Sequence, residues 1–206
     1  MISHLHKCIF TAVPRTASKS VRQAFGLPLL GRDYHPTFPH IVDPYGHTPL
    51  ATYQDQPFFS SYFKFAFVRN PWDRAVSAYF YLRAGGCNEH DRAFQQAHVT
   101  DFNTFETFVH GLPVLHTKYP HLRPQSHWLL NHTNAVLPDF VGRYETLADD
   151  FKQVQSWLAA PTTPNLLHVN QSQHEHYKNY YTTETWLTVA RVYEQDIRLF
   201  GCHASL

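Results

Sequence analysis

The stretch from Lys7 to Phe25 joins an apolar run, a polar turn and an amphipathic segment in direct succession. The run from Cys8 to Val13 is apolar and partly β-branched, which predicts a buried strand. Pro14 ends this run, and apolar residues recur with helical spacing after the turn 15–18. The first turn of such a helix, near Lys19, presents backbone N–H groups and the positive end of the helix dipole. The stretch therefore predicts a strand, an anion-binding loop and a helix, with phosphate or sulfate as the ligand.

This loop is not a Walker-type P-loop, although its expected geometry is similar. The pattern G-x-x-x-x-G-K-[ST] requires two glycines, and no glycine occurs between Lys7 and Phe25. Polar turns between a strand and a helix are common in proteins of many functions. A second motif is therefore needed before the loop can indicate a particular ligand.

Length and charge limit the classes of protein to consider. The 206 residues are enough for one domain with a full core, so a single domain over residues 1–206 is expected. The 17 Lys and Arg against 16 Asp and Glu give a net charge of +1, which does not favour a nucleic-acid partner. Any anion site must therefore be local.

Cysteine, histidine and hydropathy patterns add three expectations. Cys8, Cys87 and Cys202 are widely spaced without a C-x-x-C pair, which favours reduced thiols in a reducing compartment. The 16 histidines include no H-E-x-x-H helix and no spaced Cys/His cluster, so no metal site is expected. No apolar run approaches the roughly 18 residues that span a bilayer, and the first predicted strand begins close to Met1. These patterns predict a cytoplasmic protein with no membrane partner.

Strand-like and helix-like segments alternate along the chain. A long irregular segment, Gly26 to Ser61, separates the first helix from the next strand, and residues 161–164 form a turn. Further strands are predicted at 62–68 and 136–144, and further helices at 71–84, 102–109, 123–131, 147–158 and 183–200. This alternation predicts an α/β fold with a central, mainly parallel sheet flanked by helices. Ligands of such sheets bind at the carboxyl ends of the strands.

A second motif occupies such a strand end. Arg69 follows the predicted strand at 62–68, and Ser77 lies eight residues later in the helix that Pro71 opens. Arginine offers a planar fork of donors and serine a hydroxyl, a combination suited to a terminal phosphate monoester. An ordinary strand–helix corner with a surface arginine is the alternative interpretation.

The two motifs together resemble those of sulfotransferases that use 3′-phosphoadenosine 5′-phosphosulfate (PAPS). The family loop is commonly written P-K-T-[AG]-[GS]-[TS]-S, and residues 14–20 read P-R-T-A-S-K-S. The family's 3′-phosphate motif is commonly R-[DN]-P-x-x-R-x-x-S, and it is matched by Arg69, Asn70, Pro71, Arg74 and Ser77. Stretches at 62–74, 139–151, 168–181 and 196–201 also resemble bacterial relatives of the carbohydrate sulfotransferases (sulfotransferase family 2 type). The resemblance covers nearly the whole chain.

This resemblance implies a P-loop-like three-layer fold and a PAPS donor, with no metal. It implies that Arg15 and the loop residues Thr16, Ala17, Ser18, Lys19 and Ser20 hold the 5′-phosphosulfate. Arg69 and Ser77 would bind the 3′-phosphate. Tyr144 is similar to a tyrosine that contacts adenine in relatives, with a core tyrosine as the alternative. The acceptor would be a carbohydrate or another small polar molecule, and the oligomeric state is not indicated.

The loop departs from the family pattern at the lysine that contacts the 5′-phosphate and the bridging oxygen. Arg15 stands in its place, and Lys19 occupies a position usually held by Ser or Thr. Arginine keeps the charge but is bulkier and is not interchangeable with lysine. Either Arg15 takes over the catalytic role, which is the preferred interpretation, or Lys19 shares it.

Transfer to a hydroxyl also calls for a general base, and histidine suits neutral pH. His47 in Y-G-H-T lies where related carbohydrate sulfotransferases carry a G-H pair with a catalytic histidine, and His40 is the second candidate. Gln125 and Trp128 match a P-Q-x-x-W-L pattern of bacterial relatives, which predicts either a wall of the site or core packing. If neither histidine is the base, acids such as Asp43 or Asp55 would be candidates.

Two other functions remain open at this point. One is a phosphotransferase that uses ATP and magnesium. The missing Walker glycines argue against it, as does the lack of an evident strand-end carboxylate to hold the metal. The other is a catalytically inactive module that binds a nucleotide or a glycan. Turnover with PAPS, ATP hydrolysis with magnesium, or neither would distinguish the three.

Overall fold

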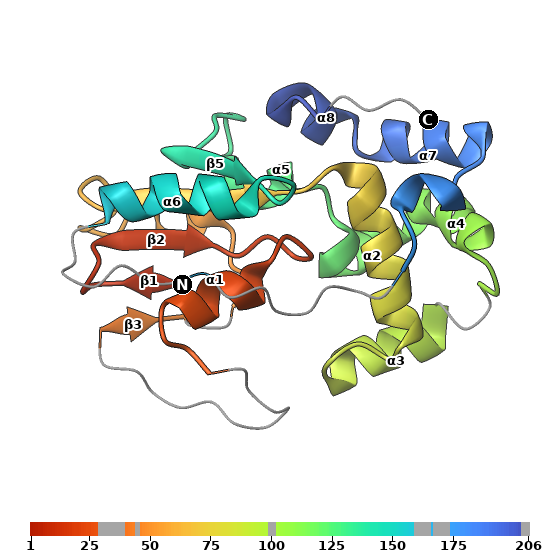
Figure 1. The fold of residues 1–206 in the computed structure, drawn as a ribbon, viewed down its shortest axis with the longest axis horizontal. Coiled ribbons are helices and arrows are strands. Elements are labelled where there is room, and N and C mark those ends of the chain that lie inside the picture. The colour runs from red at the N-terminus through yellow and green to blue at the C-terminus, as the bar shows by residue number, and fades with distance from the viewer. Residues whose placement is uncertain (29–39, 44–45, 99–101, 159–165, 167–173, 203–206) are drawn as a thin grey trace. The chain divides into compact units, whose positions relative to one another are not determined.

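The computed structural model describes residues 1–28, 40–43, 46–98, 102–158, 166 and 174–202 (Figure 1). The chain forms two compact units, each made of two separate segments. The first unit comprises residues 1–68 and 125–170, and the second comprises residues 69–124 and 171–206. The expectation of a single domain stays a prediction.

The first unit is built on a five-stranded sheet with the strand order β3-β1-β2-β4-β5. Strands β2, β4 and β5 are parallel, whereas β1 pairs antiparallel with both β2 and β3. The elements of this unit are β1 (Ile2–Ser3), β2 (Cys8–Thr11), α1 (Ser18–Ala24), β3 (Ile41–Val42), η1 (Leu50–Tyr53), β4 (Phe63–Val68), α5 (Ser126–Leu129), β5 (Phe140–Arg143) and α6 (Leu147–Trp157). This α/β architecture, with a parallel centre, confirms the predicted fold class.

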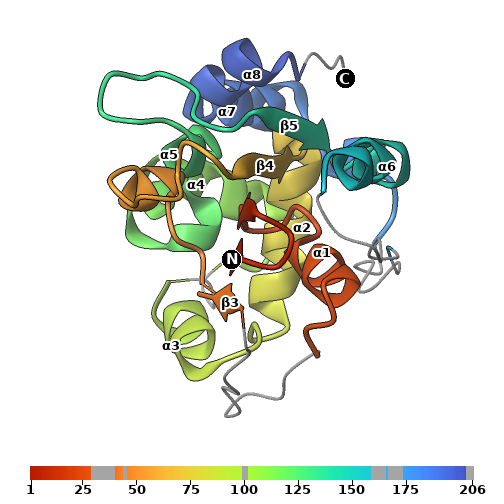
Figure 2. The same ribbon diagram turned by 90° about the vertical axis from the view of Figure 1, so that its left-hand side faces the viewer.

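The two faces of this sheet are covered by different helices (Figure 2). Helices α1 and α6 pack on one face, where Val21 and Phe151 join the phenylalanines of β2 and β4 in one buried cluster. On the other face, Leu50 of the 3₁₀ helix η1 packs against Ile9 of β2, and α5 contacts η1. The buried strands carry apolar side chains on both faces, as expected for parallel strands covered on both sides.

Close packing also explains a glycine in β5. A Cβ atom at Gly142 would lie 2.5 Å from Cε1 of Phe67. Only a residue without a side chain therefore lets the Phe67 ring lie against this strand.

The second unit is helical and packs around α2. Its elements are α2 (Pro71–Arg83), α3 (Glu89–His98), α4 (Phe105–Lys118), η2 (Pro120–Leu122), η3 (Tyr177–Tyr180), α7 (Thr183–Val192) and α8 (Glu194–Phe200). Trp72 of α2 stacks on Trp186 of α7 with ring centroids 4.4 Å apart, and its indole N–H donates to the Trp186 carbonyl at 3.0 Å. Tyr181 donates its hydroxyl to the Trp72 carbonyl at 2.8 Å. These contacts fix the start of α2 within its unit.

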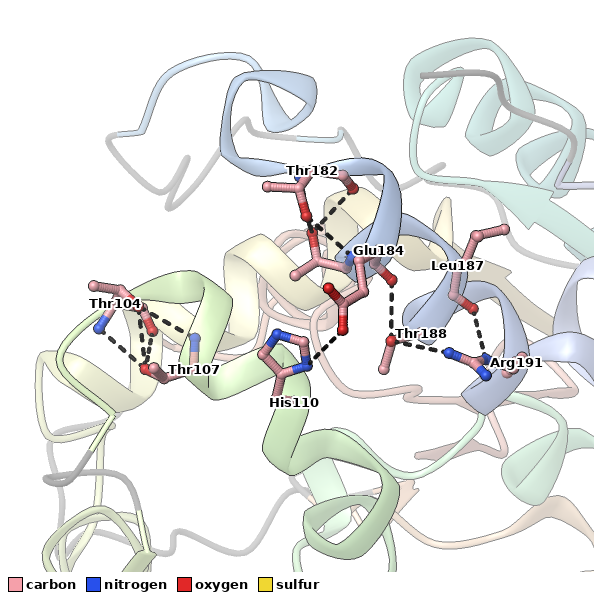
Figure 3. Close-up of polar contacts among 9 residues, drawn as sticks. Thr104, Thr107, His110, Thr182, Glu184, Leu187, Thr188 and Arg191 are labelled. Atoms are coloured by element: carbon pink, nitrogen blue, oxygen red, sulfur yellow. Dashed lines mark hydrogen bonds and ion pairs between the residues drawn. The ribbon is translucent and has the colours of Figure 1, made fainter.

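Helices α4 and α7 lie in contact, and both begin with a Thr-x-x-Thr capping box (Figure 3). Thr104 accepts a hydrogen bond from the backbone N–H of Thr107, and Thr182 accepts one from Thr185. In each pair the second threonine accepts in return from the backbone N–H of the first. Reciprocal caps of this kind satisfy backbone donors that the helix itself leaves without partners.

The helices differ from the sequence prediction where tertiary contacts decide. Helix α4 continues through Pro113 to Lys118. A proline inside a helix removes one backbone hydrogen bond, but the burial of Leu112 and Leu115 on the core side outweighs that loss. Helix α3 was not predicted. The closing segment forms two helices, divided at Tyr193, whose buried hydroxyl donates to the Leu122 carbonyl at 2.8 Å. The predicted turn at 161–164 lies outside the described residues.

A buried carboxylate joins α3 to the rest of the second unit. Asp91 accepts hydrogen bonds from the hydroxyls of Tyr81 and Tyr119 and, at 2.9 Å, from the backbone N–H of Cys87. Burial raises the pKa of this carboxyl, but the hydrogen bonds outweigh that effect, and the pKa lies below its ordinary value. With a lowered pKa, the stabilisation is present at neutral pH and is lost as the pH falls through the folded-state value.

Replacing Tyr119 with Phe is expected to lower the free energy of unfolding by about 1–2 kcal/mol, because a charged, buried acceptor loses one donor. Chemical denaturation at neutral pH measures this change. Tyr79→Phe is the matched control, since the Tyr79 hydroxyl accepts from the exposed Arg83, at 3.1 Å. An equal loss in the two variants would contradict the importance assigned to Asp91.

Candidate active site

The loop between β2 and α1 has an alternating backbone. Arg15 and Ala17 adopt left-handed conformations, with φ of 66° and 68°, and Thr16 between them does not. Such alternation turns successive backbone N–H groups towards one side and forms an anion-binding concavity. Left-handed geometry in a residue other than glycine costs roughly 1–2 kcal/mol. The loop thus reaches the compact shape of an anion loop without the Walker glycines.

Two buried hydroxyl groups hold this loop in shape. The side chains of Thr16 and Ser18 both donate to the carbonyl oxygen of Val13, each at 2.9 Å. Thr16 is completely buried and Ser18 nearly so. In this structure their hydrogen atoms therefore stabilise the turn. The direct donors to a bound anion would be the backbone N–H groups at the start of α1.

The charges around the loop favour an anion. The first turn of α1 contains no acidic residue, and it carries the exposed Lys19. A cation at this end of a helix is unfavourable with respect to the helix dipole unless a bound anion compensates for it. Arg15, four residues earlier in the chain, is partly exposed. The predicted 5′-phosphosulfate residues 15–20 thus lie in one loop and one helix turn.

His47 is hydrogen-bonded to the strand that leads into this loop. Its Nδ1 atom lies 2.5 Å from the carbonyl oxygen of Ala12, the residue directly after β2. A carbonyl can only accept, so Nδ1 carries the proton in the neutral ring and Nε2 carries the lone pair. The ring is half-buried, and its centroid lies 6.2 Å from that of Trp128. His47 therefore has the tautomer and the fixed orientation that a general base needs.

The other candidate bases are placed differently. His40 is exposed and has a left-handed backbone with φ of 70°, and its carbonyl accepts from the N–H of His4 at 2.8 Å. Asp55 is also exposed. Asp43 accepts from the N–H of Gly46 at 3.0 Å and from two hydroxyl groups, so its carboxylate is already used within the protein. Among these residues, His47 has the most suitable environment for a base.

Tyr144 and Trp128 also belong to the first unit. Tyr144 directly follows β5, and its backbone N–H donates to the carbonyl of Val68 at 2.7 Å, which extends the β4–β5 pairing by one residue. Its side chain is half-buried. Gln125 and Trp128 are buried at the start of α5 and within it. The adenine contact of Tyr144 stays a prediction.

Arg69 and Ser77 belong to the second unit. Asn70 caps α2 by accepting from the N–H groups of Trp72 and Asp73, and Pro71 occupies the first helical position, as predicted. The Arg69 Nε–H donates to the Asp73 carboxylate at 2.8 Å. Ser77 is fully buried two turns into the helix. Their common role towards a 3′-phosphate stays a prediction.

Arg74, the second arginine of this motif, has a structural position. Its guanidinium donates to the carbonyls of His121, at 3.2 Å, and Arg123, and lies 3.7 Å from the buried carboxylate of Asp196. Only 2% of the residue is exposed. Arg74 therefore joins α2 to two other parts of its unit, which accounts for an arginine at this place in the motif.

Two further features are absent from the described residues. No group of three or more His, Cys, Asp or Glu side chains there could hold a metal ion. No helix in that part of the chain is long and apolar enough to cross a membrane.

The first unit is thus an α/β structure in which a parallel strand leads into a loop with left-handed backbone at Arg15 and Ala17, and His47 is hydrogen-bonded to the end of that strand. A model of the Sulfotransferase family (Sulfotransfer_2) matches residues 1–202. The chain belongs to the sulfotransferase family, and the resemblance expected from the two motifs is confirmed.

Two curated relatives have the same name. Carbohydrate sulfotransferase 14 of Homo sapiens and that of Mus musculus are each 34% identical to this chain over 113 residues. The aligned part covers 48% of this chain and 30% of each relative. The chain therefore matches less than a third of the length of either relative. No solved structure matches the chain.

Proposed function

We propose that this sulfotransferase transfers the sulfuryl group of PAPS to a hydroxyl group of a carbohydrate or another small polar acceptor. The hydrogen bond from His47 Nδ1 to the Ala12 carbonyl is the observation that carries this proposal. It links the candidate base to the strand end from which the anion loop begins. The acceptor class follows the name of the two relatives, which are carbohydrate sulfotransferases.

The loop fits the 5′-phosphosulfate of such a donor. Left-handed backbone at Arg15 and Ala17, the start of α1 and the cations Arg15 and Lys19 combine N–H donors with positive charge. Arg15 would stabilise the negative charge that develops on the leaving phosphate, as a fixed donor does in other group transfers. The proposed 3′-phosphate ligands are Arg69 and Ser77, and the proposed adenine contact is Tyr144.

His47 would act on the acceptor. Its Nε2 takes the proton of the acceptor hydroxyl while the oxygen forms a bond to sulfur. The bond between sulfur and the bridging oxygen of the donor breaks in the same in-line displacement. The products are the sulfate ester and 3′-phosphoadenosine 5′-phosphate, and the proton on His47 then passes to solvent. Positioning of donor and acceptor supplies much of the rate in a reaction of this type.

The donor is tested by the thermal stabilisation that nucleotides produce. The product nucleotide, 3′-phosphoadenosine 5′-phosphate, is expected to stabilise the protein by about 2.7 kcal/mol at roughly 100 times its dissociation constant. For a chain of this length, that corresponds to a rise in melting temperature of about 5–10 °C. ATP, with or without magnesium, is expected to produce a much smaller shift because it has no 3′-phosphate for Arg69 and Ser77.

The control is adenosine 5′-monophosphate, which differs from the product nucleotide only at the 3′ position. Equal shifts with ATP and with the 3′-phosphorylated nucleotide would contradict the proposal and favour a phosphotransferase. Incubation of purified protein with sulfur-labelled PAPS and a panel of sugars and small alcohols then identifies the acceptor.

A further inference from the structure

We propose that Asp43 is a positioning residue that holds His47 in its catalytic orientation, together with Arg22 of α1. This inference rests on the proposed role of His47 as the base. It assigns no direct contact between Asp43 and a substrate. The residues that carry it all lie in the first unit, between the first helix and η1.

Asp43 contacts the residues on both sides of His47. Its Oδ1 accepts from the backbone N–H of Gly46 at 3.0 Å, and its Oδ2 accepts from the hydroxyl of Thr48 at 2.6 Å. The hydroxyl of Tyr53 in η1 donates to the same Oδ2 at 2.5 Å. One carboxylate therefore fixes the residue before His47, the residue after it, and the 3₁₀ helix that follows.

The approach of Asp43 to Gly46 explains the glycine of the Gly-His pair. A Cβ atom at position 46 would lie 2.0 Å from the Asp43 Oδ1. Any side chain there would displace the carboxylate from the turn. The contact between Asp43 and position 46 therefore requires a glycine, and this contact helps to hold the adjacent His47 in place.

Arg22 fixes the other polar group of Gly46. Its Nη2 donates to the Gly46 carbonyl at 2.8 Å, and the arginine is only 7% exposed. The N–H of Gly46 is bound by Asp43 and its C=O by Arg22, so this turn cannot rotate without breaking one of the two bonds. Since α1 begins in the anion loop, Arg22 also connects the base to the helix expected to bind the donor.

Asp43 is suited to this role by its charge. Burial raises the pKa of its carboxyl, but the hydrogen bonds from Thr48, Tyr53 and Gly46, together with the positive charge of the amino terminus, outweigh that effect and keep the pKa below its ordinary value. The carboxylate therefore stays ionised at neutral pH and accepts hydrogen bonds from several donors. A group with a lowered pKa is a poor proton acceptor, which is consistent with Asp43 acting through His47.

The first test is a double-mutant cycle between the two residues. Asp43→Asn is expected to lower kcat about 10-fold, because a misplaced catalytic group loses rate, while the affinity for 3′-phosphoadenosine 5′-phosphate remains unchanged. Combined with His47→Ala, it should cause no further loss, since Asp43 acts only through the imidazole. A purely structural role would lower the residual activity of His47→Ala as well.

The second test observes His47 without turnover. Nitrogen-15 NMR of labelled protein, with the His47 signals assigned by their absence in His47→Gln, should show the Nδ1-protonated tautomer in the wild type. In Asp43→Asn, these signals should move towards the average of a mobile ring. Asp139→Asn is the matched control. Asp139 directly precedes β5, and its carboxylate also binds a backbone N–H and a side chain, both of Lys64 in β4.

These tests separate failure of the inference from failure of the proposed base. If His47→Ala is inactive while Asp43→Asn turns over like the wild type, or if the cycle is additive, the positioning role of Asp43 is wrong. Unchanged His47 signals in Asp43→Asn also overturn it. Full activity of His47→Ala instead overturns the base, and the positioning role then falls with it.

A milder variant keeps the inference testable if Asp43→Asn does not fold. Tyr53→Phe removes one hydrogen bond to Oδ2 and leaves the carboxylate and the Gly46 contact in place. It should lower kcat by about 3-fold and again show no effect in the His47→Ala background. Wild-type turnover of Tyr53→Phe combined with unchanged His47 signals would contradict the inference.

Discussion

Replacing His47 with Ala is expected to lower kcat by about 10² to 10⁴ while the affinity for the donor nucleotide remains nearly unchanged. The reason is that a general base acts on the acceptor proton in the transition state and does not contact the donor. Single-turnover transfer from labelled PAPS measures kcat, and a titration with 3′-phosphoadenosine 5′-phosphate measures donor binding. Acidification should have a similar effect on the wild type, because a protonated imidazole has no lone pair to offer.

His40→Ala is the control, since His40 lies in the same segment but is exposed. We expect turnover close to that of the wild type. Loss of activity at His40 with little loss at His47 would move the base to His40. If neither variant loses activity, an acid such as Asp55 or an acceptor that hardly needs a base would have to be considered.

The acidity of the acceptor gives an independent check on His47. An acidic phenol gives up its proton readily, so it depends less on a base than an aliphatic hydroxyl does. The loss in His47→Ala should therefore be smaller with a phenol than with a sugar hydroxyl. Equal losses with both acceptors would indicate that His47 has a role other than proton transfer.

The parallel centre of the sheet could be predicted because its signals are local. Strands β2 and β4 are continuous apolar runs, and the structure has them at Cys8–Thr11 and Phe63–Val68, within the predicted ranges. Strands β1 and β3 have only two residues each. Strand β1 pairs with the nearby β2, Ile2 with Ile9, but strands of two residues leave no period that a sequence pattern could show. Strand β3 pairs only over a long distance in the chain, Val42 with Ile2.

The candidate site shows the same division between local and distant information. The sequence predicts the loop 15–20, and a resemblance directs attention to His47. What orients His47 comes from elsewhere: the Ala12 carbonyl lies 35 residues earlier in the chain, and Arg22 lies 24 residues before Gly46. The sequence indicates Asp43 only as a substitute base, although an Asp three residues before a Gly is typical of a turn in which the carboxylate accepts from the backbone.

The backbone of the anion loop was also beyond prediction. Glycine is the usual residue for positive φ, so a loop without glycine gives no local sign of left-handed geometry. Arg15 and Ala17 adopt it in a turn where the Val13 carbonyl accepts from two hydroxyl groups, those of Thr16 and Ser18. The energetic cost of this left-handed backbone occurs in the loop whose proposed function needs N–H groups that point to one anion.

Replacing Arg69 with Ala is expected to weaken binding of 3′-phosphoadenosine 5′-phosphate by about 1.5 to 3 kcal/mol, roughly a 10- to 100-fold rise in Kd. Arg69 is 5% exposed, and Asp73 fixes its Nε through a hydrogen bond of 2.8 Å. A guanidinium has five N–H donors in a planar fork, which suits bidentate binding of a phosphate.

The nucleotide series decides whether this contact is to the 3′-phosphate. Calorimetric titration of wild type and Arg69→Ala with the product nucleotide and with adenosine 5′-monophosphate forms a cycle in which only the 3′-phosphate differs. The loss should appear with the first nucleotide and be nearly absent with the second, because the second has no group for Arg69 to bind. Arg83 is an exposed arginine at the other end of α2, so Arg83→Ala should bind both nucleotides as the wild type does.

The fold should survive the Arg69 change, which far-ultraviolet circular dichroism checks. If Arg69→Ala binds the product nucleotide as tightly as the wild type, the 3′-phosphate must be held by other residues.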